Sequence, residues 1–338
     1  MARSTDVPGS GTPPRTRVRR FLRTADGVPV EVVYEPGAAV RGGSGGRPDA
    51  ASGPPSVDLV FVVAHGFTGD LDRPHVRRVA RVLARYGAVV TFSFRGHGSS
   101  GGRSTVGDRE VLDLAAAVAW ARGFGHPRVA TVGFSMGGSV VLRHAALYGE
   151  GADPADAGTE TVAEASGRSE AWGRAGARAG AGTDTVVSVS APARWYYRGT
   201  APMRRLHWLV TRPEGRLVGR YGFRTRIHHR DWDPVPLSPV EAVPRIAPVP
   251  LLIVHGDRDA YFPLDHPRTL AAAAGDRGEL WLEPGMGHAE NAAPDALLHR
   301  IARWTLAQQG LGTSGRTPAR PAPGPGPQGG RREFDHRA

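Results

Sequence analysis

The sequence contains no cysteine, which excludes a disulfide framework, a thiolate metal site and a cysteine nucleophile. It also contains no lysine, so its 43 basic residues are all arginines, and the net charge is +11. Arginine without lysine, together with 46 glycines and 29 prolines, is typical of a GC-rich coding bias. The positive charge therefore does not by itself indicate nucleic-acid binding, and we expect no nucleic-acid partner.

Long apolar runs are missing as well. No apolar run, residues 59–64 included, approaches the roughly 20 residues that span a bilayer. Residues 1–20 are basic but lack the apolar core of a signal peptide. We therefore expect a cytoplasmic protein with no transmembrane segment. Its hydrophobic fraction of 40% suffices for a sizeable core.

Low-complexity segments suggest the domain organisation. Residues 1–17 are rich in Pro, Gly, Ser and Arg, and are predicted to be a disordered arm. Residues 311–338 contain Pro-Ala-Pro-Gly-Pro-Gly-Pro and are predicted to be a disordered tail. Residues 18–310 then form one domain, in which residues 149–184 are a low-complexity insertion with little periodicity.

Strand and helix patterns alternate along this domain. Residues 20–34 predict a hairpin that turns at Asp26-Gly27. Further strands are expected at residues 57–64, 88–94, 129–134, 185–190, 250–255 and 279–282. Helices are expected at residues 74–86, 108–121 (capped by Asp108), 136–148, 266–274 and 294–308. This alternation predicts an α/β fold with a mostly parallel sheet and helices on both faces.

Residues 191–248 interrupt the alternation between the sixth and seventh expected strands. They are rich in aromatic residues and are predicted to form a lid over the strand ends. Part of the lid is expected to be a helix that begins at Pro202, with an apolar stripe of Met203, Leu206, Val210 and Leu217. From this lid we expect Trp195, Tyr196 and Trp208 to contact substrate.

Ten arginines lie between residues 194 and 230 of the lid. One interpretation is a pocket for an acyl substrate that carries an anionic head group. The other, which we favour on composition, is a solvated surface in an arginine-biased chain. The two interpretations differ in how salt should affect the binding of charged and neutral esters.

The sequence motif G-x-S-x-G occurs three times. At residues 42–46 and 98–102 it lacks the context of a preceding strand and a following helix. At residues 133–137 a β-branched strand precedes Ser135 and a helical pattern follows at once. A strand, a sharp turn at one serine and a helix make up a nucleophile elbow. Ser135 is therefore the candidate nucleophile.

A serine hydroxyl needs a base within hydrogen-bond reach, and a carboxylate orients that base. His288 lies in a glycine-containing loop just after the last expected strand, which makes it the candidate base. Two aspartates, Asp257 and Asp259, follow the strand at residues 250–255, and both are candidates for the acid.

Four motifs occur in the order used by one family. They are His-Gly-Phe-Thr-Gly at residues 65–69, Arg-Gly-His-Gly-Ser at 95–99, Gly-Phe-Ser-Met-Gly at 133–137, and the pair Asp259 and His288. With them, residues 21–308 resemble an α/β-hydrolase. The resemblance is closest to small serine esterases, monoacylglycerol-lipase-like enzymes and serine aminopeptidase-like hydrolases.

The resemblance implies roles for individual residues. Its pattern G-x-x-D-x-x-x-P selects Asp259 as the acid and leaves Asp257 as a turn residue. The backbone N–H groups of Phe67 and Met136 would form the oxyanion hole, and the Phe67 side chain would line the substrate pocket. His65 and His97 would be structural. Relatives often have an aspartate where this chain has Ser93, two residues before Arg95, so the ion pair that this aspartate makes in relatives is left open here.

The function that follows is a serine hydrolase that cleaves a carboxylic ester, thioester or small amide through an acyl-enzyme. The expected partner is a small-molecule acyl substrate. No metal or organic cofactor is implied, and the sequence does not indicate an oligomeric state. Two alternatives remain open: an acyltransferase with the same triad, and a non-catalytic ligand-binding relative.

Overall fold

A computed structural model describes residues 16–37, 58–149 and 180–311 of the chain. The predicted arm, low-complexity insertion and tail lie almost wholly outside the described residues. Within the described residues, no helix combines the length and the apolar character needed to cross a bilayer.

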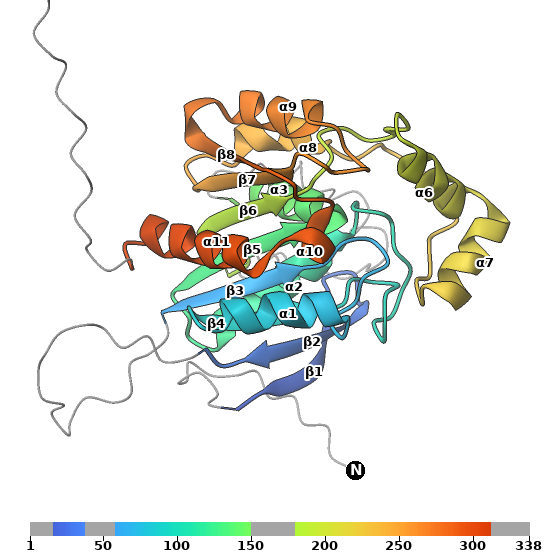
Figure 1. Cartoon of the computed structure of the whole chain (residues 1–338). Helices are drawn as coiled ribbons and strands as arrows, with labels where there is room; N and C mark the ends of the chain where they lie inside the picture. The colour runs from blue at the N-terminus through green and yellow to red at the C-terminus, as the bar shows by residue number, and fades with distance from the viewer. Residues whose placement is uncertain (1–15, 38–57, 150–179, 312–338) are drawn as a thin grey trace, which may run out of the picture.

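The described residues form one twisted sheet of eight strands in the order β1-β2-β4-β3-β5-β6-β7-β8 (Figure 1). The strands are β1 (Val18–Arg23), β2 (Pro29–Glu35), β3 (Leu59–Ala64), β4 (Ala88–Phe92), β5 (Arg128–Phe134), β6 (Thr185–Val189), β7 (Leu251–Gly256) and β8 (Gly278–Glu283). The pairs β1–β2 and β2–β4 are antiparallel, and all the others are parallel. The predicted hairpin and the mostly parallel sheet are both confirmed.

Helices cover both faces of the sheet (Figure 1). One face carries α1 (Pro74–Leu83), α10 (Ala289–Ala292) and α11 (Asp295–Gln308); the other carries α2 (Glu110–Gly123), α3 (Met136–Tyr148), α8 (Pro239–Ala242) and α9 (Asp265–Ala274). Central strands such as β3, Leu-Val-Phe-Val-Val-Ala, are buried along their whole length. A strand covered on both sides has no polar face to present, which explains its continuous apolar sequence.

The helix expected from residue 108 begins instead at Glu110, and Asp108 does not cap it. The Glu110 carboxylate reaches back and accepts hydrogen bonds from the backbone N–H groups of Thr105 and Gly107 (2.8 and 2.9 Å). Asp108 instead lies 3.5 Å from the Arg143 guanidinium. The prediction failed because a buried glutamate fixes this loop before the helix starts.

Between β6 and the short helix α8, the chain carries two helices, α6 (Ala201–Thr211) and α7 (Pro213–Gly222), where one was expected. Pro213 starts the second helix, so the predicted apolar stripe ends at Val210, and Leu217 lies exposed on α7. The chain returning from α7 is attached to the body by backbone bridges, His97 to Thr225 and Ser104 to Ile227. We call residues 201–222 the α6–α7 hairpin.

Candidate active site

Ser135 lies at the sharp turn between β5 and α3. Its backbone has φ 51° and ψ −113°, a conformation that L-residues rarely adopt and that costs about 1–3 kcal/mol. The flanking glycines are required by close packing: a Cβ on Gly133 would overlap the carbonyl of Gly137, and one on Gly137 would overlap the carbonyl of Ala64. The turn therefore needs both glycines of the motif, and it presents the serine hydroxyl at the carboxyl edge of the sheet.

Three side chains from different strand ends meet at this edge. His288 Nε2 lies 2.9 Å from Ser135 Oγ, and His288 Nδ1 lies 2.7 Å from Asp259 Oδ2. The other carboxylate oxygen, Asp259 Oδ1, accepts hydrogen bonds from the backbone N–H groups of Tyr261 (2.8 Å) and Phe262 (3.1 Å). The hydrogen bonds therefore run without a break from the loop after β7, through the imidazole, to the elbow serine.

Burial and hydrogen bonding together set the charge state of Asp259. Its side chain is fully buried, which opposes ionisation, but the hydrogen bond from His288 and the backbone N–H donors prevail and lower the pKa of the carboxyl below its usual value. An ionised Asp259 keeps the proton of a neutral His288 on Nδ1 and leaves Nε2 free to accept the proton of Ser135. This arrangement is what a general base needs.

Asp257, the other candidate acid, lies away from the imidazole. Its Oδ1 accepts the backbone N–H of Gly285 at 2.6 Å, and its side chain is exposed. This hydrogen bond joins the loops after β7 and β8. Of the two aspartates, the structure brings only Asp259 to His288.

The loop after β3 lies directly beside the elbow. A Cβ on Gly66 would lie 3.4 Å from the Cβ of Ser135. Among the described residues, the backbone N–H groups of Phe67 and Met136 have no hydrogen-bond acceptor. Met136 directly follows Ser135, and Phe67 directly follows Gly66, which lies beside Ser135, so both amides remain candidates to bind an oxygen next to Ser135.

His65 and His97 support this loop rather than react. His65 Nδ1 donates to the carbonyl of Gly66 (2.7 Å) and Nε2 accepts the N–H of Phe94 (3.1 Å). His97 Nδ1 donates to the carbonyl of Arg95 at 3.0 Å. Burial lowers the pKa of His65 to about 3 and that of His97 to about 4, so both rings are neutral at pH 7.

Two further residues contact the site and were not identified from the sequence. The Tyr261 ring stacks on the His288 imidazole, with centroids 4.2 Å apart. The buried carboxylate of Glu290 accepts the N–H of Gly66 at 2.9 Å. Tyr261 lies two residues after Asp259, a local signal that could have been used. Glu290 and Gly66 are 224 residues apart in the chain, and no local pattern connects them.

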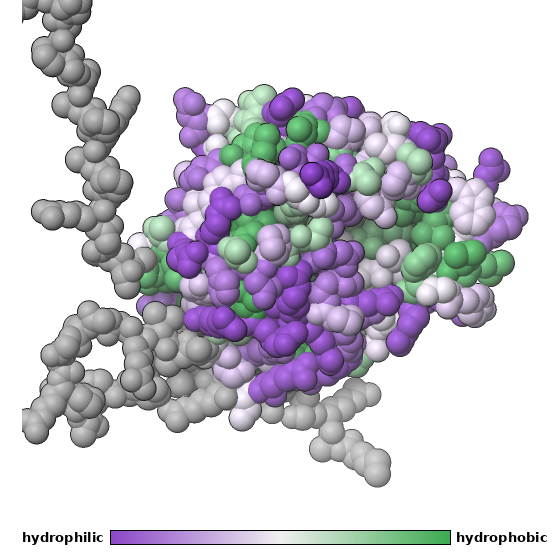
Figure 2. Space-filling view, in the orientation of Figure 1, coloured by the Kyte–Doolittle hydropathy of each residue, from purple (hydrophilic) through white to green (hydrophobic). Residues whose placement is uncertain are grey.

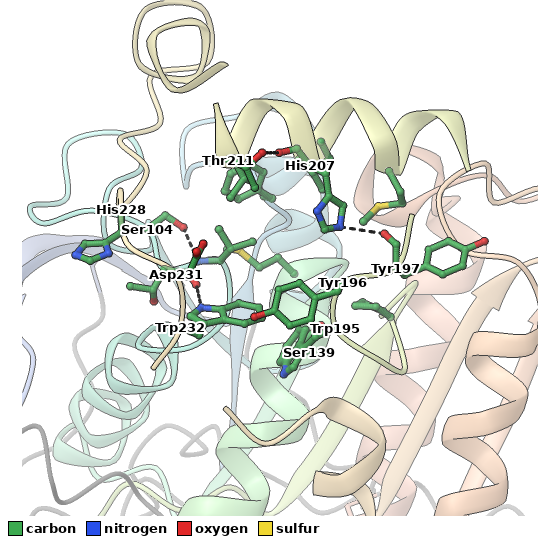
Figure 3. A pocket seen from close by; sticks show the side chains of 18 of the residues that line it. Ser104, Ser139, Trp195, Tyr196, Tyr197, His207, Thr211, His228, Asp231 and Trp232 are labelled. Carbon is green, nitrogen blue, oxygen red and sulfur yellow. Dashed lines mark hydrogen bonds between the residues drawn. The ribbon is translucent and has the colours of Figure 1, made fainter. Parts of the chain in front are cut away.

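A cavity of about 700 Å³ opens above Ser135, beneath the α6–α7 hairpin (Figure 3). Three of the residues predicted to contact substrate line it: Phe67, Trp195 and Tyr196. Trp195, Tyr196 and Trp232 lie across the cavity from His207 on α6 (Figure 3). Ser135 therefore lies at a cavity whose wall combines aromatic and aliphatic side chains with polar and basic ones.

Trp208, the fourth residue predicted to contact substrate, is not in the cavity lining, and its side chain is 47% exposed. Helix α6 directs Met203, Leu206 and Val210 toward the cavity. Position 208 lies on the opposite face of a helix with 3.6 residues per turn. The prediction for Trp208 is corrected accordingly.

The lid arginines fall into two groups. Four line the cavity: Arg194, Arg198, Arg216 and Arg230. The only carboxylate in the lining is that of Asp231. The other six arginines between residues 194 and 230 lie outside the cavity. The lining is therefore net basic, whereas most of the lid arginines belong to the surface.

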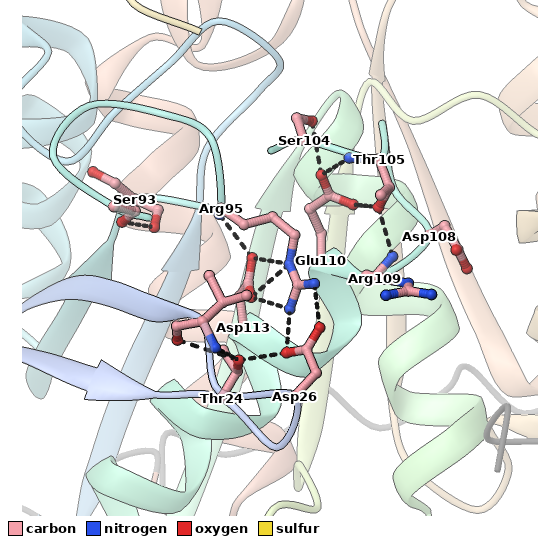
Figure 4. A network of polar contacts seen from close by, with 12 residues as sticks. Thr24, Asp26, Ser93, Arg95, Ser104, Thr105, Asp108, Arg109, Glu110 and Asp113 are labelled. Carbon is pink, nitrogen blue, oxygen red and sulfur yellow. Dashed lines mark hydrogen bonds and ion pairs between the residues drawn. The ribbon is translucent and has the colours of Figure 1, made fainter. Parts of the chain in front are cut away.

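A buried ion-pair network answers the question of which group pairs with Arg95 (Figure 4). Its guanidinium lies 2.7 Å from Asp113 on α2 and 2.7 Å from Asp26 in the β1–β2 turn. Burial opposes the charge, but these carboxylates prevail and raise the pKa of Arg95. Ser93 instead accepts the N–H of Leu71 through its hydroxyl. Asp113 and Asp26 thus provide the counter-charges for Arg95.

Comparisons with known proteins agree with this architecture. A sequence model of the "Alpha/beta hydrolase family" matches residues 59–300. Esterase Pf2001 of Pyrococcus furiosus is similar in structure, with a TM-score of 0.57, 20% identity, and coverage of 88% of this chain and 97% of its own. The esterase domain of a Rhodothermus marinus protein (TM-score 0.53, 16% identity, coverage 87% and 99%) is also similar. So is GrgF from Penicillium sp. sh18 (TM-score 0.53, 16% identity, coverage 86% and 97%).

Proposed function

Because the chain belongs to the alpha/beta hydrolase family, we propose that it is a serine hydrolase that cleaves a carboxylic ester through an acyl-enzyme intermediate. The observation that carries the proposal is the hydrogen-bonded series Asp259–His288–Ser135 at the base of an open cavity. Two of the similar structures are described as esterases, which favours an ester over an amide as the substrate.

In the first half of the reaction, Ser135 Oγ attacks the ester carbonyl carbon while His288 Nε2 accepts the hydroxyl proton. Asp259 stabilises the imidazolium that forms. The oxyanion of the tetrahedral intermediate accepts hydrogen bonds from the backbone N–H groups of Phe67 and Met136. As the intermediate collapses, His288 returns the proton to the leaving alcohol, and the acyl group stays on Ser135.

In the second half, a water molecule enters the position of the departed alcohol. His288 removes a proton from this water as its oxygen attacks the acyl carbon, and the same two amides receive the second oxyanion. Collapse then releases the carboxylic acid and returns the proton to Ser135 Oγ. Stacking of Tyr261 on His288 restricts the imidazole to one orientation through both halves.

Labelling with a fluorophosphonate probe tests the nucleophile. We expect a single adduct at Ser135, absent in Ser135→Ala. Ser139→Ala is a matched control, because Ser139 lines the same cavity and its hydroxyl has no partner among the described residues. Unlabelled wild type, or equal loss of labelling in both variants, would contradict the proposal.

Product analysis with a panel of esters tests the reaction class. A hydrolase releases the free acid even when another alcohol is present. Transfer of the acyl group to added alcohol as the main product would identify an acyltransferase instead. Binding of the esters without turnover would identify a ligand-binding relative.

A further inference from the structure

The α6–α7 hairpin carries an unusual concentration of exposed apolar side chains. Of the nine large hydrophobic residues exposed in the described parts of the chain, five lie between residues 208 and 223. Four of them form what we call the α7 patch: Leu217, Val218, Tyr221 and Phe223. Tyr221 is 75% exposed and Leu217 is 57% exposed. A gathering of exposed apolar side chains of this kind marks an interaction site.

The α7 patch is separate from the substrate cavity. None of its four residues lines the cavity, which α6 faces with Met203 and Leu206. The inner side of α7 is formed by small residues: a Cβ on Gly215 would overlap the backbone of Trp208 on α6, and one on Gly219 would lie 3.0 Å from Ile227. Packing thus fixes which side of α7 is buried. Figure 2 shows hydrophobic surface where α7 projects from the body.

The surface around the patch is strongly basic. Residues 201–224 contain six arginines, of which Arg216 lines the cavity and the other five lie outside it, but only one acidic residue, Glu214. Within the described residues, none of these six arginines forms an ion pair with a carboxylate. Arg220 lies over the Tyr221 ring, 5.6 Å from its centroid, so a cation and an exposed aromatic ring stand together on the outer side of α7.

The positive charge around the α7 patch favours an anionic lipid surface over a second copy of the chain as the partner. Symmetric pairing of two copies through the α7 patch would bring two arginine-rich faces together and would be opposed by like-charge repulsion. An amphipathic helix with apolar and arginine side chains on its exposed side is suited to the interface of an anionic bilayer. We propose that the α7 patch docks onto a surface of anionic lipids, with Leu217 and Tyr221 entering the headgroup region and the arginines contacting the headgroups.

Docking requires no unfolding of the hairpin. The returning chain is already fastened to the body by the N–H of Ser104, which donates to the carbonyl of Arg226 (2.7 Å), and by the N–H of His228, which donates to the carbonyl of Ser104 (2.8 Å). The protein therefore presents a rigid helix to the lipid surface, with the cavity on the other side of the hairpin. The inference is independent of the proposed catalytic activity.

Co-sedimentation of the full-length chain with vesicles tests the inference. We expect binding to vesicles of phosphatidylcholine with phosphatidylserine and much weaker binding to phosphatidylcholine alone. The double variant Leu217→Ser/Tyr221→Ser removes apolar contacts with the lipid, and the double variant Arg220→Gln/Arg224→Gln removes two positive charges. Each should weaken vesicle binding at least about tenfold. All four side chains are exposed, so the fold should be kept; thermal unfolding checks this.

Matched control variants distinguish an effect of the α7 patch from an effect of the overall positive charge of the protein. Phe21→Ser removes an apolar side chain that is 55% exposed on β1, and Arg268→Gln removes an exposed charge on α9. Both should bind like wild type, and all variants should hydrolyse a short soluble ester at the wild-type rate. Equal binding by patch and control variants would overturn the inference. The inference would also be overturned if the wild type did not bind vesicles but formed a dimer that the patch substitutions dissociate.

Discussion

The hydrogen bonds around Asp259 make the substitution Asp259→Asn especially informative. Oδ1 of Asp259 accepts two backbone N–H groups, from Tyr261 and Phe262. In the variant, the amide oxygen must take this position, because the amide NH₂ group cannot face two donors. The NH₂ group is then directed at His288 Nδ1, where the carboxylate oxygen Oδ2 stands in the wild type.

This reversal changes the tautomer of the imidazole. Facing a donor, His288 Nδ1 must act as an acceptor, so the ring proton moves to Nε2, which then cannot take the proton of Ser135. Loss of the correct tautomer and of the charge that stabilises the imidazolium lowers kcat by about 10⁴-fold, or about 5.5 kcal/mol. The substitution removes no volume, so the melting temperature should change little.

Asp257→Asn is the matched control. Its amide oxygen can still accept the N–H of Gly285, and it lies away from His288, so kcat should stay within about twofold of wild type. The assay is steady-state hydrolysis of a chromogenic ester, with burst kinetics to separate acylation from deacylation. If Asp259→Asn kept a tenth of wild-type activity, or if Asp257→Asn fell equally far, the assignment of the acid would be refuted.

Four further predictions follow from described contacts. Glu290→Ala removes the acceptor for the Gly66 N–H and should lower kcat/KM about tenfold, whereas Glu290→Gln, which keeps an acceptor, should restore most of it; equal losses would refute this role. Gly137→Ala places a methyl group against the carbonyl of Ala64 and should prevent stable folding; an unchanged melting temperature would contradict the packing. The pKa of His65 is about 3 when folded and about 6.5 when unfolded, so the unfolded chain binds the extra proton and stability falls as the pH drops below 6.5. At pH 4.5 this loss is about 3 kcal/mol, and urea unfolding at pH 7 and 4.5 should show a smaller loss for His65→Gln. Because the cavity lining is net basic, added salt should raise KM for an ester with a carboxylate more than for its neutral analogue; equal responses would leave the lid arginines as solvated surface.

The parts of the molecule that the sequence predicted well are those with local signals. Strand, turn and helix around Ser135 are encoded in consecutive residues, so the elbow is confirmed at its expected place. The helical insertion was placed correctly between β6 and β7, but Pro213 divides it into two helices. The predicted apolar stripe, which assumes one helix, therefore includes Leu217, whereas this side chain is exposed on the second helix.

Contacts between distant residues were not predictable in this way. The Glu290–Gly66 hydrogen bond and the Arg95–Asp113 ion pair join segments whose approach depends on the order of strands in the sheet. Trp208 was misassigned because its aromatic character was followed, although the predicted stripe of Met203, Leu206 and Val210 already places position 208 on the opposite face of the helix.

The network around Arg95 bears on how the protein can be shortened. The family match begins at residue 59, yet Asp26 in the preceding β1–β2 turn supplies one of the two carboxylates for Arg95, whose side chain is only 3% exposed. A fragment cut at the start of the match would keep Asp113 but lose Asp26, and would also uncover the edge of β4, which pairs with β2. A fragment expected to fold like the intact chain should therefore keep both β1 and β2, so expression fragments should retain residues 16–37.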